Sequence, residues 1–194
     1  MISDILKQLN WIDFLMIVLF LRIIFMALST GFALELFKLL GTLASLYISL
    51  HYFTVFTDWM GGRSTTAKGK FPLQFMDFIS LIAIAIIGYL IFVALRLVFD
   101  RFIKMEIHPL VNKGVALMLG SFRGLFLTSL LAFILAVSSV GYLKDSVRSS
   151  FTGRRVFNLA VDTYSWTWDH IASRFSAGEK FNSTVLEVQK DLNP

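Results

Sequence analysis

Charged residues inside apolar stretches are the first candidates for chemistry in this 194-residue chain, and Arg22, Glu35 and Arg123 are placed in this way. An Arg at the centre of a membrane span costs ~2.5–3.5 kcal/mol on insertion scales, so it is expected to have a partner or to serve an ion pathway. Arg22 and Glu35 flank the turn-forming residues 29–31, at roughly 12 Å and 7 Å from the turn centre along a helix. The sequence therefore predicts an intramembrane ion pair between Arg22 and Glu35, and it marks Arg123 as a further candidate functional charge.

Other catalytic and metal-binding arrangements are not supported by the residue types and their spacing. The chain has no Cys, which excludes disulfides and thiolate ligands. His51, His108 and His170 are too scattered for metal-ligand spacing, and the isolated His51 is more typical of a packed or interfacial residue. Residues 61–70 resemble a phosphate-binding loop, but no Ser or Thr follows Gly69-Lys70, so a solvated basic loop is favoured. The sequence predicts no enzyme, no catalytic residue, no metal and no cofactor.

The elements that would position the charges are long apolar helices. Hydrophobic residues make up 56% of the chain, and the mean hydropathy is +0.71. Charged residues make up 16%, whereas a soluble domain has about 25%. Stretches near the ~20 apolar residues that span a bilayer core run over residues 12–28, 32–56, 75–95 and 113–140. A cleaved signal peptide is an alternative for the first, because Lys7 precedes it, but Arg22 interrupts it and favours a retained span.

Small residues recur at every fourth position of the last stretch. A four-residue step keeps side chains on one slowly drifting face of a helix. Small side chains on that face let helices approach closely in lipid, which offers no hydrophobic reason to associate. A buried helix of a soluble bundle is the alternative, but the uncharged run over residues 124–143 has the length of a span. The residues predicted to pack helices are Gly41 and Ser45 in the second stretch and Ala116, Gly120, Gly124, Thr128 and Ala132 in the fourth.

After Gly141 the chain becomes more polar and basic. Apolar residues recur at helical spacing from Val156 through Leu159 and Tyr164 to Phe175. This pattern predicts an amphipathic helix in the plane of the membrane interface, and a helix packed on a partner domain is the alternative. We therefore expect an all-α integral membrane protein with four transmembrane helices in a small bundle plus a C-terminal amphipathic helix. The expected divisions are a transmembrane domain (1–143), a basic linker with the interfacial helix (144–175) and a polar, loosely ordered tail (176–194).

Short motifs follow one another in a fixed order through the apolar region. They are Asn10-Trp11-Ile12-Asp13 at the first span, Gly31-Phe32, Glu35-Leu36 and Leu40-Gly41 at the second, and Asn112-Lys113-Gly114 to Gly120 with Phe122-Arg123-Gly124 at the fourth. In these motifs the chain resembles the CvpA family, the colicin V production proteins of bacterial membranes, over residues 10–142. One departure is Leu28-Ser29-Thr30, which stands where the family usually has a basic pair before the Gly-Phe turn.

The resemblance implies a four-helix protein of the bacterial inner (cytoplasmic) membrane with no known catalytic residues. The family is required for production of a secreted peptide toxin and is associated with envelope homeostasis. Our prediction is a non-enzymatic, multi-pass protein that supports toxin (bacteriocin) production or export, or envelope homeostasis, through a partner. The alternative is a small oligomeric channel or transport protein that uses Arg22, Glu35 and Arg123.

The expected partners are membrane lipids and either a second copy of the chain or another membrane protein. The net charge of +5 indicates anionic lipid headgroups rather than nucleic acid. Which side the termini face stays open. The count of basic residues in the connecting segments favours a cytoplasmic N-terminus. The family favours the opposite orientation, because some members carry an extracytoplasmic domain after the fourth span.

Overall fold

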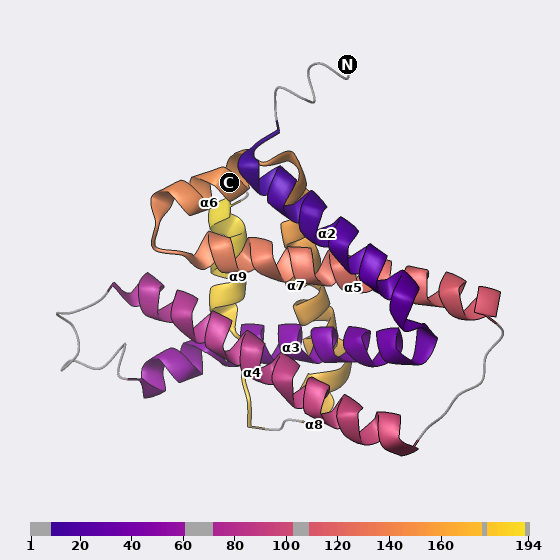
Figure 1. Ribbon diagram of the computed structural model, residues 1–194. Helices are drawn as coiled ribbons and strands as arrows, with labels where there is room; N and C mark the ends of the chain where they lie inside the picture. Colours follow the sequence, from indigo (N-terminus) through magenta and orange to yellow (C-terminus); the bar gives the residue numbers. More distant parts are fainter. Residues whose placement is uncertain (1–8, 61–71, 103–108, 176–177, 193–194) are drawn as a thin grey trace.

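The computed structural model describes residues 9–60, 72–102, 109–175 and 178–192, and every regular element in these ranges is a helix (Figure 1). Four helices are long and apolar enough to cross a membrane, which confirms the predicted all-α bundle. The predicted basic loop at 61–70 and His108 lie outside the described residues. The helices are α2 (Trp11–Thr30), α3 (Phe32–Trp59), α4 (Leu73–Phe102), α5 (Pro109–Val137), α6 (Gly141–Ser149), α7 (Phe151–Thr167), the π-helical turn η1 (Trp168–Ala172), α8 (Ser173–Phe175) and α9 (Ser183–Leu192).

α5 lies at the centre of the bundle, in contact with α2, α3, α4 and α7. α2 packs mainly along α5, whereas α3 packs mainly along α4, so α2 and α3 diverge from the bend that joins them (Figure 1). Gly31 alone forms that bend. Its φ of 81° lies in the left-handed region that side chains disfavour, and a Cβ there would lie 3.0 Å from Nδ2 of Asn112. The first hairpin is therefore open, and α5 contacts both of its arms.

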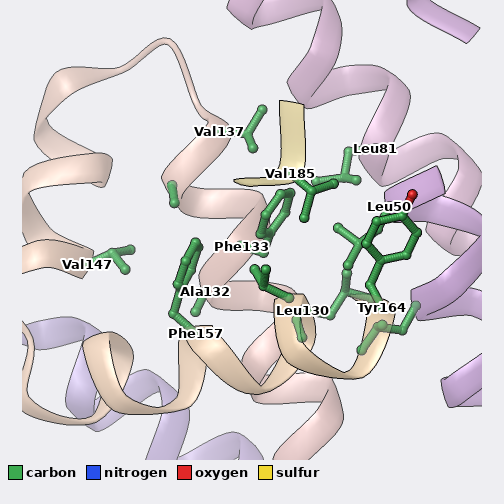
Figure 2. Packing of buried hydrophobic residues seen from close by; sticks show 14 of the residues in the cluster. Leu50, Leu81, Leu130, Ala132, Phe133, Val137, Val147, Phe157, Tyr164 and Val185 are labelled. Atoms are coloured by element: carbon green, nitrogen blue, oxygen red, sulfur yellow. The ribbon is translucent and has the colours of Figure 1, made fainter. Parts of the chain in front are cut away.

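The hydrophobic core joins the spans to the C-terminal helices. Phe133 of α5 stacks on Phe157 of α7 with 5.5 Å between the ring centroids. Figure 2 shows these rings beside one another, with Val185 of α9 on one side and Tyr164 of α7 near Leu50 of α3. Helices that follow the last span therefore contribute to the same core as the spans.

The amphipathic helix α7 buries its apolar side against α5 of the same chain. Ser129 Oγ of α5 donates to the carbonyl oxygen of Phe157 (3.3 Å) and accepts from the backbone N–H of Ala160 (2.6 Å). The buried face coincides with the expected one only in part, because it includes Tyr164 but is turned towards Phe157. Phe157 is fully buried, Val156 is partly buried, and Phe175 at the end of the expected stripe is exposed. The side of α7 that faces α5 is the one that carries Phe157, whose ring stacks on Phe133 of α5.

The expectation of a loosely ordered tail is wrong for residues 178–192, which contain α9. Val185 and Leu192 are buried in the core, and Phe181 and Val188 are partly buried beside them. Within α9, spacings of three and four residues place Val185, Val188 and Leu192 on one face of the helix, and Phe181 precedes the helix. The segment is polar on average because most of its other residues are polar. Its few apolar side chains nevertheless pack against the bundle, and this packing stabilises the helix.

A chain of hydrogen bonds also holds this segment against α3. The backbone N–H of Asn182 donates to the Tyr164 hydroxyl (2.9 Å), which lies 3.0 Å from Nδ1 of His51. The hydroxyl can therefore donate its own proton to Nδ1, which leaves Nε2–H of His51 facing Glu179 at 3.3 Å. Burial raises the pKa of Tyr164 to about 12, because its phenolate form would lose hydration. His51 is thus a packed residue, as its isolation in the sequence indicates.

Candidate functional site

Motif residues of the second and fourth spans converge at one end of the bundle, around the carboxylate of Glu35. Glu35 lies in the first turn of α3 and is fully buried. Its Oε1 accepts hydrogen bonds from Thr30 Oγ1 (2.5 Å) and from Lys38 Nζ (2.7 Å). Its Oε2 forms an ion pair with Nη2 of Arg123 at 2.9 Å. One buried carboxylate is therefore held by two cations, one from its own helix and one from α5.

Arg123 reaches Glu35 because α5 approaches α2 very closely. Arg123 is only 5% exposed, and Gly120 and Gly124 lie three residues before it and one after it. A Cβ on Gly120 would lie 2.3 Å from Cβ of Ala27, and one on Gly124 would lie 2.7 Å from the Phe20 ring. The surfaces of α5 and α2 meet at these glycines. Because the glycines have no side chains, the two helices lie close enough for Arg123 to contact Glu35.

Asn112 forms a second link at the same end. Its Oδ1 accepts a hydrogen bond from the backbone N–H of Phe32 at 2.6 Å, so it satisfies a free donor at the start of α3. The close approach of Gly31 to the same side chain makes this contact possible. Sequence reasoning missed this role, because Asn112 and Phe32 are 80 residues apart. The arrangement closes this end of the bundle by joining α3 to α5 twice.

The structure does not bring Arg22 and Glu35 together, which corrects the predicted ion pair. Arg22 is exposed on the outer side of α2 and forms no ion pair with the described residues. The prediction assumed that the two arms of the first hairpin run side by side. They diverge instead, and α5 supplies Arg123 as the cation for Glu35. Arg123, the further candidate functional charge, is therefore part of the ion pair.

The other residues predicted to pack helices lie at buried helix contacts. A Cβ on Gly41 would lie 2.7 Å from Cβ of Phe92 in α4. Ser45 Oγ donates to the carbonyl oxygen of Ala85 in α4 at 2.7 Å. The remaining three, Ala116, Thr128 and Ala132, are buried along α5. Gly41 and Ser45 thus lie at the contact of α3 with α4, whereas the two glycines of α5 lie at its contact with α2.

The motif of the first span forms a separate polar link at the opposite end of the bundle. Asp13 is fully buried, and its carboxylate accepts hydrogen bonds from Ser150 Oγ (2.7 Å) and from the backbone N–H of Thr152 (2.6 Å). The Thr152 hydroxyl and the backbone N–H groups of Asn10 (2.7 Å) and Phe151 (3.3 Å) also donate to it. Asp13 thus caps both α2 and the start of α7. No sequence pattern indicates that Ser150 and Thr152 are its hydrogen-bond partners.

Asp13→Asn is expected to lower the free energy of unfolding by about 0.5–2 kcal/mol, the usual range for loss of a helix cap. The amide keeps the size of the side chain but turns an NH₂ group towards donors of α2 or α7. Thermal unfolding in detergent measures the loss, and hydrogen exchange at residues 150–153 locates it. Asp162→Asn, at an exposed position of α7, is the matched control. Equal melting temperatures for both variants would contradict the capping role.

Comparison with models of protein families matches residues 12–160 of the chain to the family described as Colicin V production protein. Comparisons with curated proteins and with solved structures find no match. The matched region contains the links made by Glu35, Asn112 and Asp13 and ends within α7. Because it covers well over half of the 194 residues and confirms the resemblance seen in the motifs, the chain belongs to the colicin V production protein family.

Proposed function

We propose that this protein is a non-enzymatic, multi-pass protein of the bacterial inner membrane that supports production or export of a secreted peptide toxin, or envelope homeostasis, by binding a partner within the membrane. The family and the four apolar helices support the membrane setting. The proposal of a partner rests on the position of Arg22. Its charged side chain lies on the outside of the bundle, where lipid would otherwise surround it.

Arg22 belongs to a continuous exposed face of α2. Val18, Leu21 and Phe25 are its neighbours on that face and are all exposed. The residue lies roughly 12 Å along the helix from the bend, so its charge is well inside the span. An Arg in this position costs ~2.5–3.5 kcal/mol unless a partner or water receives it. A carboxylate or a free carbonyl on a neighbouring membrane helix would remove that cost, so this face is the proposed binding surface.

The channel alternative has less support from the geometry. Glu35 and Arg123 are buried and paired with one another, which is the arrangement of an ion pair that closes a bundle. A conducting path needs charged groups that line a water-filled cavity. The remaining charge, Arg22, faces outward. Closure of the bundle therefore accounts for Glu35 and Arg123, and partner binding accounts for Arg22, so none of the three charges requires a conducting path.

A photo-crosslinking residue placed at Phe25 tests the surface in living cells, with the same residue at Leu90 on the exposed face of α4 as the control. We expect an adduct from position 25 that disappears in Arg22→Leu, and none from position 90. Two differently tagged copies show whether the partner is a second copy of the chain. Equal adducts from both positions would contradict the surface. An ion flux in liposomes that Arg22→Gln abolishes would favour the channel alternative instead.

A further inference from the structure

A basic cleft opens where α6, α7 and α9 meet, at the end of the bundle where α2 begins. Its volume is about 820 Å³. Arg148 of α6, Arg154 and Arg155 of α7, and Lys190 of α9 line it, and no Asp or Glu is among the described residues of its wall. Ser149, Asn158 and Gln189 add polar groups. The charge of this cleft attracts anions, and its volume admits a group as large as a lipid headgroup.

The four cations of the cleft are not neutralised from within the described part of the chain. None of them forms an ion pair with a described residue. Two nearby carboxylates are already engaged, because Asp191 pairs with Lys144 and Asp13 is buried among its hydrogen-bond donors. A cleft lined by charges of one sign focuses the field and concentrates counterions. Because all four side chains are exposed, an anion that enters the cleft meets their combined charge.

One of the cations is held in place by an aromatic ring of its own helix. Cζ of Arg155 lies 3.9 Å from the centroid of the Phe151 ring, a cation–π contact that restrains the guanidinium. A guanidinium stacked in this way keeps its N–H edge free, and that edge matches the oxygens of a phosphate in a bidentate manner. Beside it, Gln189 Nε2 donates to Asn158 Oδ1 at 3.1 Å and links α9 to α7. These contacts favour a phosphate over a simple halide.

Aromatic residues place the cleft at the surface of the membrane. The Trp11 ring stacks on Tyr142 with 6.1 Å between centroids, and both side chains are exposed. Exposed Trp and Tyr are typical of the interface between hydrocarbon and headgroups. Trp11 Nε1 donates to Ser146 Oγ (3.1 Å), and Asn10 Nδ2 donates to Ser149 Oγ (3.0 Å), so the wall of the cleft is attached to the start of the span. At this depth phosphate esters of lipids are abundant.

We propose that the cleft binds a phosphate-bearing anion at the membrane surface. The headgroup of an anionic phospholipid supplies this chemistry at the depth of the cleft, and inorganic phosphate or a soluble phosphate ester supplies it from the aqueous side. The inference rests on the cleft alone and does not depend on the partner proposed for α2.

The test compares two triple variants with the same change in net charge. Arg148→Gln/Arg154→Gln/Lys190→Gln removes three cations of the cleft and leaves the stacked Arg155 in place. Lys113→Gln/Arg174→Gln/Lys180→Gln removes three exposed cations elsewhere. Native mass spectrometry of the purified full chain, with phosphatidylglycerol against phosphatidylcholine, measures bound lipid. We expect a loss of phosphatidylglycerol affinity of roughly fivefold per removed charge in the cleft variant, and less than about twofold in the control.

A second arm distinguishes the source of the phosphate. Thermal stability is measured in detergent with inorganic phosphate against chloride at equal ionic strength. Stabilisation by phosphate without preference for phosphatidylglycerol would assign the cleft to a soluble anion. Equal lipid binding by the two triple variants, with no effect of phosphate on either, would overturn the proposal. If the cleft variant does not fold, Lys190→Gln against Lys180→Gln gives the same comparison with one charge each.

Discussion

Glu35→Gln is expected to destabilise the bundle by about 3–5 kcal/mol, the range for breaking a buried ion pair by removing one partner. The substitution leaves Arg123 and Lys38 as two buried or nearly buried cations without their carboxylate. Arg123→Gln is expected to cost less, because Lys38 still neutralises Glu35. Thermal or chemical unfolding in detergent measures both losses. We expect the larger loss for Glu35→Gln, because Glu35 pairs with two cations whereas Arg123 pairs with one carboxylate.

The double variant Glu35→Gln/Arg123→Gln should recover part of the loss, since only Lys38 then lacks its partner. Arg22→Gln is the control, because it removes a cation of the same kind from the exposed side of α2. It should leave the stability of the purified protein almost unchanged. Losses from the two single variants that simply add in the double variant would show that Glu35 and Arg123 are not coupled, and the ion pair would be wrong.

Gly120→Leu is expected to lower the free energy of unfolding by at least about 1–3 kcal/mol, the usual cost of forcing a bulky side chain into a packed contact. Even the first carbon of the new side chain would lie 2.3 Å from Cβ of Ala27. Gly114→Leu, on the same helix, is the matched control, because no described atom beyond its own stretch of helix lies within 4 Å of its Cβ position. Melting temperature and monodispersity in detergent are the measurements.

A smaller exchange tests the same contact without a large clash. Gly120→Ala alone should destabilise, whereas Gly120→Ala/Ala27→Gly moves the methyl group from α2 to α5 and should restore most of the stability. In the exchanged pair the new Cβ would lie 3.8 Å from Cα of residue 27, an ordinary contact distance. If the exchange gives no recovery, or if Gly114→Leu is as harmful as Gly120→Leu, close packing of α5 on α2 does not determine the stability.

The spans and their small-residue faces could be predicted from the sequence because both signals are local. An apolar run of sufficient length and a four-residue repeat need no knowledge of the partner helix. The repeat indicates that another helix packs closely at Gly120 and at Gly41, but it does not identify that helix. α2 and α4 are the neighbours, and only the packed structure identifies them.

The ion pair could not be predicted because it depends on the angle between two helices. Distances measured along each arm from the Gly31 bend suggested Arg22 as the partner of Glu35, but the arms diverge and Arg123 arrives from a helix far along the chain. Asp13 presents the same difficulty, since its acceptor oxygens meet donors near Thr152. The ordered α9 was missed for a different reason, because its apolar residues, Val185 among them, stand within a polar segment.

The two cations that pair with Glu35 are synthesised at different times during translation. Glu35 and Arg123 are 88 residues apart (123 less 35), so a ribosome adding 5–20 residues per second completes Arg123 roughly 4–18 s after Glu35. Lys38 is synthesised almost together with Glu35 and contacts it within one turn. The carboxylate therefore has a local counterion while the first two spans enter the bilayer, and the second cation arrives only with the fourth span. Lys38 can therefore neutralise Glu35 from the time of insertion, and in the finished bundle both cations hold the carboxylate.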